Sequence, residues 1–332
     1  MNKKIILRLF VLLISVLILP ISTSSCTRNT IYSEGNGDLN VLCTSFAPFD
    51  FARNVCGDAA TVSILQDSGS DLHNYTPTTA TLDAIANADL FIYVGGISDE
   101  NWIHDAIKAS GNEDLTLICL MDFVEPVYAE LENDWSDHSH GEHEHIHNEH
   151  GHEGHDHGAD EHIWTSPRNA ISLVNAICDV LCSIDSKNSV LYKENSASYI
   201  EKLSELDKIM SDLTSDSPTA PLIFADRFPF VYLMHDYHIP YKAAFSGCST
   251  EINSSVNTHA SLIEAVRANN SSAIIIIEGS GKDLAEAIAN ETGCGIIKLN
   301  SMQSVTREDI VSGASYLDFM KENVEALKEV LE

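Results

Sequence analysis

A run of histidines near the middle of the chain is the first feature able to do chemistry. Between His138 and Gly158, nine imidazoles are interleaved with Glu, Asp and Gly. Imidazole nitrogen and carboxylate oxygen suit zinc, nickel or copper. Ordering such a polar loop costs roughly 1–2 kcal/mol per residue, so we expect weak capture of several ions; the alternative is a solvated loop with no specific role. The histidines concerned are His138, His140, His143, His145, His147, His150, His152, His155 and His157.

Two histidines outside the run lie next to predicted secondary structure, which could fix their positions. His73 follows a predicted strand, and His162 lies between the run and a helix expected to start at Pro167. Taken alone, either residue is also compatible with an ordinary polar loop. Both become candidates for a fixed metal site because histidine is a common metal ligand at neutral pH.

The charge of the chain favours cations as partners. Asp and Glu number 49 against 19 Lys and Arg, a net charge of −30, and no Lys or Arg occurs from Ala109 through Pro167. This excess repels phosphate backbones and anionic bilayers, so binding of nucleic acid or phospholipid by the folded part is not expected. An exported metallohydrolase would need a general base beside its metal, and no HExxH motif is present outside the histidine run.

The first residues read as an export signal. Lys3, Lys4 and Arg8 precede a short apolar run, and small residues follow up to Cys26. That order is typical of a secretory signal over residues 1–25. The end of the segment resembles a bacterial lipobox, although Thr23 stands where Leu is usual. We therefore expect a lipid on Cys26 that anchors the protein to the outer face of the cytoplasmic membrane, or a periplasmic protein if Cys26 is not lipidated.

The rest of the chain must supply the elements that position these residues. Strand and helix patterns alternate on both sides of the histidine run, which predicts α/β units with parallel sheets. We expect a tether at 26–38, an N-terminal lobe at 39–188 with a flexible loop at 134–161, a connecting helix at 189–215 and a C-terminal lobe at 216–332. Strands are predicted at 39–46, 61–65, 90–94, 115–120, 222–224, 273–277 and 295–299, and helices at 49–56, 79–88, 102–110, 167–184, 189–213, 262–268, 285–292 and 315–331. Ligands of such folds bind at the carboxyl ends of the strands.

Several motifs carry a resemblance to a known family. Gly69-x-x-x-His73-x-Tyr75-x-Pro77 is followed by Asn-Ala-Asp-Leu, Gly-Gly, the histidine run and His162-Ile-Trp-x-x-Pro-x-Asn-Ala. This order resembles the solute-binding proteins of zinc and manganese ABC importers over nearly the whole mature chain. The resemblance implies two Rossmann-like lobes joined by a long rigid helix, one divalent metal in the interlobe cleft, and delivery to a membrane permease by a monomer that is not an enzyme. Some members of this family are assigned a surface adhesin role.

The resemblance also implies a ligand set. His73 and His162 match the two N-lobe histidines of the family. For the third ligand, Ala225 or Asp226 stands at the family position; Asp226 is the first choice as an oxygen ligand, although Arg227 could pair with it instead.

For the fourth ligand two carboxylates compete. Glu278 is favoured because it ends a buried strand, and Glu251 is held in reserve. His235 is a further reserve, and Asn300, where the family often has Asp, would be a weaker neutral ligand.

Two imidazoles with one or two carboxylates suit tetrahedral Zn²⁺, whereas Mn²⁺ prefers more oxygen ligands. Asp226 in place of a third histidine moves the site toward Mn²⁺, and the histidine run favours Zn²⁺. We therefore expect a Zn²⁺-binding receptor, with a Mn²⁺ receptor of the same type as the nearest alternative.

Overall fold

The computed structural model describes residues 31–65, 75–128, 159–215, 220–246 and 256–331. Several predictions concern residues outside these ranges: the signal at 1–25, Cys26, His73, Glu251 and the histidine run. Residues 31–332 pack as one unit.

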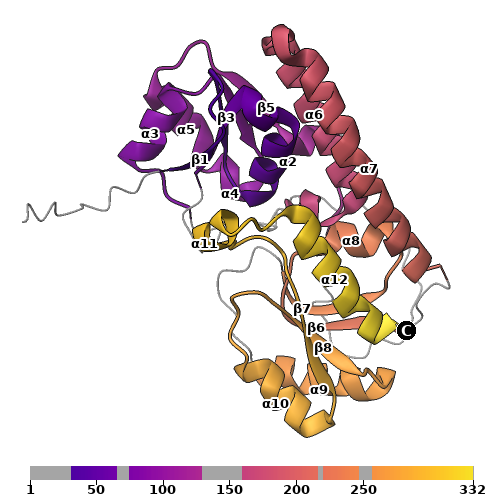
Figure 1. Ribbon diagram of the computed structural model, residues 1–332. Coiled ribbons are helices and arrows are strands. Elements are labelled where there is room, and N and C mark those ends of the chain that lie inside the picture. Colours follow the sequence, from indigo (N-terminus) through magenta and orange to yellow (C-terminus); the bar gives the residue numbers. More distant parts are fainter. Residues whose placement is uncertain (1–30, 66–74, 129–158, 216–219, 247–255, 332) are drawn as a thin grey trace, which may run out of the picture. The chain divides into compact units, whose positions relative to one another are not determined.

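The N-terminal part of this unit contains a five-stranded sheet (Figure 1). Its strands are β1 (Tyr32–Glu34), β2 (Leu39–Cys43), β3 (Ala60–Ile64), β4 (Leu90–Tyr93) and β5 (Thr116–Cys119), in the spatial order β1-β3-β2-β4-β5. β2 to β5 pair in parallel as predicted, but β1 pairs antiparallel with β3. The prediction of a wholly parallel sheet is therefore wrong at this edge. The prediction of a tether over residues 26–38 is wrong as well, because β1 lies within that range. A strand of three residues is too short to show an alternating pattern.

Within the described part of the chain, the α-helices that accompany this sheet are α2 (Phe46–Cys56), α3 (Thr79–Ala86), α4 (Ile97–Glu100) and α5 (Ile103–Ser110). The sequence predicted that this helix begins at residue 49, but it begins at Phe46, so Pro48 lies in the first turn of α2. Proline is tolerated there because the first N–H groups of a helix have no partner within the helix. α2 ends at Cys56 as predicted, and Gly57 follows it as the C-cap with φ of +52°.

Two long helices follow, and the sequence predicted both correctly. α6 spans Pro167–Ile184 and α7 spans Ser189–Leu213. The Ser166 side chain caps α6 by accepting a hydrogen bond from the Arg168 N–H at 3.2 Å, as expected for serine before proline. The two helices lie side by side, and α7 also contacts α2 and α12 (Figure 1). Among the described residues, no helix combines the length and apolar character needed to cross a bilayer.

The C-terminal sheet has four strands, all parallel, in the order β7-β6-β8-β9. They are β6 (Leu222–Phe228), β7 (Tyr241–Ser246), β8 (Ala273–Ile277) and β9 (Gly295–Leu299). Its helices are α8 (Val231–Asp236), α9 (Val256–Asn269), α10 (Asp283–Thr292), α11 (Arg307–Val311) and α12 (Tyr316–Leu331). β8 and β9 match the predicted bounds, whereas β7, α4, α8 and α11 were not predicted.

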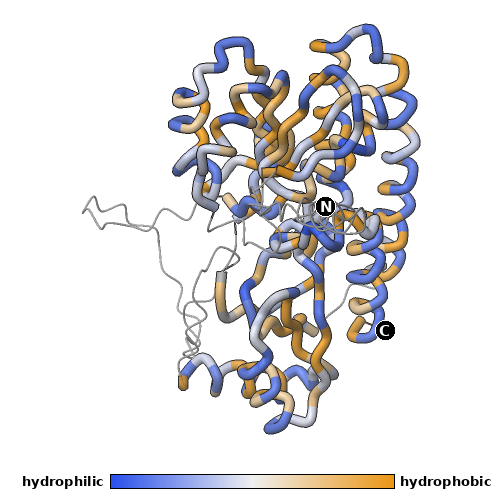
Figure 2. The backbone as a smooth tube through the Cα atoms, turned by 60° about the vertical axis from the view of Figure 1, so that its left-hand side comes forward, coloured by the Kyte–Doolittle hydropathy of each residue, from blue (hydrophilic) through white to orange (hydrophobic). Residues whose placement is uncertain are grey.

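One contiguous apolar core joins the two sheets. It includes Val41 of β2, Leu206 of α7, Ile275 of β8 and Leu327 of α12. Blue and orange segments alternate along the helices in Figure 2, as expected for helices with one polar and one apolar side. Both sheets pack into this core, and so does α7, which lies between them in the sequence. The core therefore does not divide at residues 188 and 215, and the predicted lobe boundaries at those residues remain a prediction.

Candidate metal centre

The C-terminal sheet brings two of the predicted ligands to one edge. The chain runs from β6 to β7 on one side and then to β8 on the other, so β6 and β8 are neighbours where the strand order reverses. Such a reversal is where open α/β sheets bind ligands, beyond the carboxyl ends of the strands. Asp226 lies near that end of β6, and Glu278 directly follows β8.

A bulge in β6 sets the direction of Asp226. The pairing of β6 with β7 shifts register between Phe224 and Arg227, so three steps along β6 match two along β7. Bulges of this kind re-aim a side chain near functional sites. The Asp226 carboxylate is 1% exposed and accepts the N–H of Arg227 at 2.7 Å and that of Ile277 at 3.1 Å. Asp226 thus binds the end of β8, one residue before Glu278.

Glu278 holds the turn that follows β9. Its carboxylate accepts three hydrogen bonds: from the Ser301 N–H at 2.7 Å, from Ser301 Oγ at 2.7 Å and from the Gln303 N–H at 3.1 Å. Burial raises the pKa of Glu278, and the hydrogen bonds act in the opposite direction. When ionised, Glu278 has two carboxylate oxygens that accept hydrogen bonds from Ser301 and Gln303, residues far from it in the sequence.

His162 is fully buried and its ring is oriented by a carboxylate. Asp160 Oδ1 lies 2.9 Å from His162 Nδ1 and also accepts the backbone N–H of His162 at 2.9 Å. With its proton on Nδ1, the ring presents the lone pair of Nε2, which is the arrangement common among metal-binding histidines. In the structure His162 Nε2 contacts the side-chain amide of Gln303.

The surroundings of His162 fix its backbone as well. Its ring packs edge-on against Trp164 with centroids 5.4 Å apart, and Trp164 Nε1 donates to the Ser301 carbonyl at 2.8 Å. Tyr232 Oη donates to the Asp160 carbonyl at 2.9 Å. The Tyr232 side chain of α8 and the Ser301 carbonyl of the turn after β9 therefore hold the segment that carries His162.

Next to His162 lies a buried acidic pair that the sequence did not single out. Glu161 is 2% exposed and accepts hydrogen bonds from Ser98 Oγ at 2.5 Å and the Ser98 N–H at 3.0 Å. A Cβ on Gly96 would lie 2.7 Å from Glu161, so glycine is needed there for close approach. Asp99 accepts the Gly95 N–H at 3.0 Å, and its other oxygen is buried without a hydrogen-bond partner. Burial, with the charge of Glu161, raises the pKa of Asp99 to about 7.

The structure brings some of the predicted ligands together and leaves others apart. His162 and Glu278 both contact Gln303, a residue that no motif identified. His235 lies apart, with a 62% exposed side chain 3.1 Å from Asp236. Within the described ranges no three His, Cys, Asp or Glu side chains are already grouped to hold a metal. Asn300 accepts the Met302 N–H at 2.9 Å.

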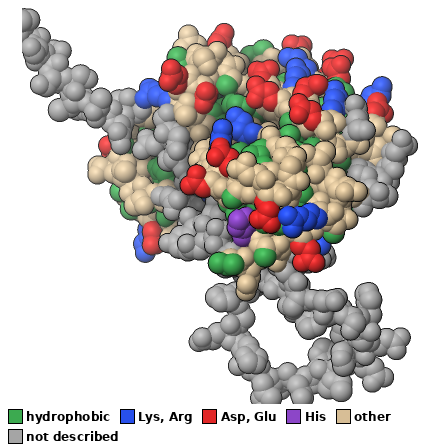
Figure 3. All heavy atoms as spheres, turned by 90° about the horizontal axis from the view of Figure 1, so that it is seen from below, with side chains coloured by type: hydrophobic (Ala, Val, Ile, Leu, Met, Phe, Trp, Pro, Cys, Tyr) green, Lys and Arg blue, Asp and Glu red, His purple; other side chains and the backbone are tan. Residues whose placement is uncertain are grey.

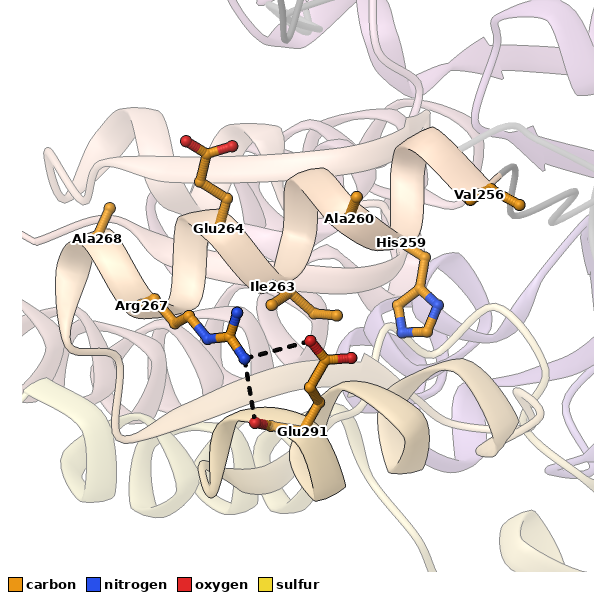
Figure 4. A pocket seen from close by; sticks show the side chains of 8 residues that line it. All are labelled: Val256, His259, Ala260, Ile263, Glu264, Arg267, Ala268 and Glu291. Atoms are coloured by element: carbon orange, nitrogen blue, oxygen red, sulfur yellow. Dashed lines mark hydrogen bonds and ion pairs between the residues drawn. The ribbon is translucent and has the colours of Figure 1, made fainter.

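Two surface features belong to other parts of the molecule. A groove of about 710 Å³ between α9 and α10 contains His259 and the ion pair of Arg267 with Glu291 at 3.2 Å (Figure 4). None of the candidate ligands lines this groove. On the face drawn in Figure 3, acidic and basic side chains lie intermixed, so this face is not a uniform acidic field.

The chain matches a known family along almost its whole length. Residues 41–330 match the model of the family described as zinc-uptake complex component A, periplasmic (ZnuA). The chain is 29% identical over 323 residues to the high-affinity zinc uptake system protein ZnuA of Bacillus subtilis, covering 97% of each chain. It is also 29% identical over 297 residues to the zinc-binding lipoprotein AdcA of Streptococcus pneumoniae, covering 89% of this chain but 56% of AdcA. The chain thus spans little more than half the length of AdcA.

A solved structure confirms the fold. The Zn(II)-bound ZnuA-like domain of Streptococcus pneumoniae AdcA superposes with a TM-score of 0.70 at 28% identity, covering 89% of this chain and 99% of that domain. The predicted α/β class and the resemblance to metal-importer binding proteins are confirmed. The family model spans almost all of the described residues, so the chain belongs to the ZnuA family of zinc-uptake components.

Proposed function

We propose that this chain is an extracytoplasmic binding protein that captures Zn²⁺ and delivers it to the permease of an ABC importer. The observation that carries the proposal is the buried His162, whose Nδ1 faces Asp160 and whose Nε2 faces the turn held by Glu278. A carboxylate behind a histidine raises its basicity as a ligand. Membership in the ZnuA family and the Zn(II)-bound AdcA domain support zinc as the cargo.

The proposed ligands are His73, His162, Glu278 and Asp226. His162 and Glu278 are the stronger part of this set, because both contact Gln303. Asp226 is adjacent through the N–H of Ile277, but its two oxygens each already accept a backbone N–H. Two imidazoles and one or two carboxylates would give Zn²⁺ its usual four ligands. The chain is proposed to bind rather than to catalyse, as a transport protein does.

The location and the histidine run complete the proposal. The sequence before residue 26 supports export, and Cys26 is the proposed site of a lipid, in keeping with the name of the AdcA lipoprotein. The mature protein would act as a monomer on the outer face of the cytoplasmic membrane. The nine histidines of the run would raise the local concentration of metal near the tight site.

Calorimetric titration of Zn²⁺ into the mature chain, residues 26–332, tests the proposal. We expect one tight site together with weaker binding by the histidine run. His162→Ala and His73→Ala should each abolish tight binding, because each removes one ligand. His235→Ala is the matched control, since this histidine also pairs with an aspartate but is exposed; it should bind like the wild type. A tight site that survives in the His73→Ala, His162→Ala double variant would contradict the proposal.

Metal preference needs a separate titration. Mn²⁺ should compete poorly, because manganese favours sites with more oxygen ligands. If Mn²⁺ instead displaces Zn²⁺ from the tight site at comparable concentration, the chain is a manganese receptor of the same type.

A further inference from the structure

The side chain of Gln303 lies on the very atom of His162 that would bind a metal. His162 Nδ1 faces Asp160 Oδ1 at 2.9 Å. Because an ionised carboxylate only accepts hydrogen bonds, this contact places the proton of a neutral ring on Nδ1 and the lone pair on Nε2. Gln303 contacts Nε2 through its side-chain amide. An amide N–H is a donor, and therefore this contact engages the same lone pair that Zn²⁺ would need.

The turn that carries Gln303 is firmly built. Met302 has φ of +62°, which is unusual for a side chain of this size. Asn300 Oδ1 accepts the Met302 N–H at 2.9 Å, and Asn323 accepts the Asn300 N–H at 2.7 Å while donating to its carbonyl at 2.8 Å. These side chains keep the turn in a strained shape. Strain of this kind gathers at ligand clamps.

Glu278 couples the same turn to the second predicted ligand. Glu278 Oε1 accepts from Ser301 Oγ at 2.7 Å and from the Gln303 N–H at 3.1 Å. A metal bound to Glu278 would compete with these hydrogen bonds for the oxygen lone pairs. Gln303 is therefore linked to both His162 and Glu278, to one by its side chain and to the other by its backbone.

We propose that Gln303 is an internal competitor for the metal. Its carboxamide holds the lone pair of His162 Nε2 when no metal is bound and turns away when the metal enters. On release it returns to Nε2, which lowers the affinity and speeds departure of the ion toward the permease. This inference rests on the proposed function, because it assigns a regulatory role within the same site.

The experiment compares Gln303→Ala and Gln303→Met with the wild type. Both variants lose the amide donor, and the Met variant keeps the length of the side chain. A net hydrogen bond of about 0.5–1.5 kcal/mol corresponds to a change of roughly 2- to 12-fold in affinity. We expect Zn²⁺ to bind more tightly by that factor and to leave more slowly when a chelator is added. Ser304→Ala, at the next position along the chain, should change neither quantity.

The direction of the effect separates this role from a structural one. A residue that only supports the fold would weaken zinc binding when removed. Unchanged or weaker binding by both Gln303 variants, with tight binding by the wild type, would overturn the inference and leave the proposed function intact. Absence of a tight site in the wild type would overturn both. Thermal unfolding of each variant checks that it is folded.

Discussion

Asp99 provides a quantitative test of how the N-terminal side of the site is built. This carboxyl is 1% exposed, one of its oxygens lacks a hydrogen-bond partner, and Glu161 lies close enough to repel it. Burial is the largest cause that raises its pKa from 3.8 to about 7, and the Gly95 N–H opposes it. Asp99 therefore keeps its proton in the folded protein at pH values where the unfolded chain has lost it.

The sign and size follow from this difference. Below about pH 4 both states are protonated and Asp99 contributes nothing to the pH dependence. Between about pH 4 and 7 the free energy of unfolding falls as pH rises, because only the unfolded state ionises. The pKa difference corresponds to roughly 4 kcal/mol above pH 7. From pH 5 to pH 8 the wild type should lose about 2–3 kcal/mol through this group.

Asp99→Asn removes the ionisation and keeps an acceptor for the Gly95 N–H. Its stability relative to wild type should increase by about 2–3 kcal/mol between pH 5 and pH 8. Urea unfolding of the metal-free protein, followed by tryptophan fluorescence at four pH values, measures this difference. Asp83→Asn, on the exposed side of α3, is the control and should show no such trend. Glu161→Gln should reduce the trend, since it removes the neighbouring negative charge.

A difference between Asp99→Asn and wild type that does not change with pH would refute the reasoning. It would mean that Asp99 is ionised in the folded state and has a partner that offsets its burial. A difference in the free energy of unfolding that is the same at every pH would not support a raised pKa of Asp99. Such a difference also arises when the amide of the variant lacks a hydrogen-bond partner, which costs about 1–3 kcal/mol at every pH.

Three further predictions concern the site, the core and the histidine run. Asp160→Ala should weaken Zn²⁺ binding about 10- to 100-fold by releasing His162; calorimetry that finds no change would contradict this role. Asp50 is fully buried and accepts from Arg53 Nη2 at 2.6 Å and Tyr199 Oη at 2.7 Å, so Asp50→Ala should cost about 3–5 kcal/mol in urea unfolding. The exposed pair of Arg267 with Glu291 is its control, and Glu291→Ala should cost less than about 1 kcal/mol. Deleting residues 138–157 should lower the number of Zn²⁺ ions bound and leave one tight site, and loss of that site would show that the ligands are wrongly assigned.

Local sequence patterns predicted the long elements well. α7 and β8 have the predicted bounds, since a helix of 25 residues and a run of buried isoleucines are recognisable without tertiary information. The short elements were missed. β1 has three residues and α4 has four, too few to show a period, and their conformation depends on the neighbours that pair with them or cover them.

The sequence by itself determined that this chain is an acidic α/β protein, and its motifs led us to propose His162 as a metal ligand. Those features are written in residue types, spacing and alternation, which are local properties. Only the tertiary structure decided that Gln303 meets His162 across 141 positions, and that the bulge in β6 directs Asp226 to the N–H of Ile277. Such contacts depend on the order of the strands and on a strained turn, and neither of these produces a repeating pattern of apolar and polar residues in the sequence. His73 is proposed as a ligand from the motifs alone, and the zinc titration of the His73→Ala variant is the experiment that tests it.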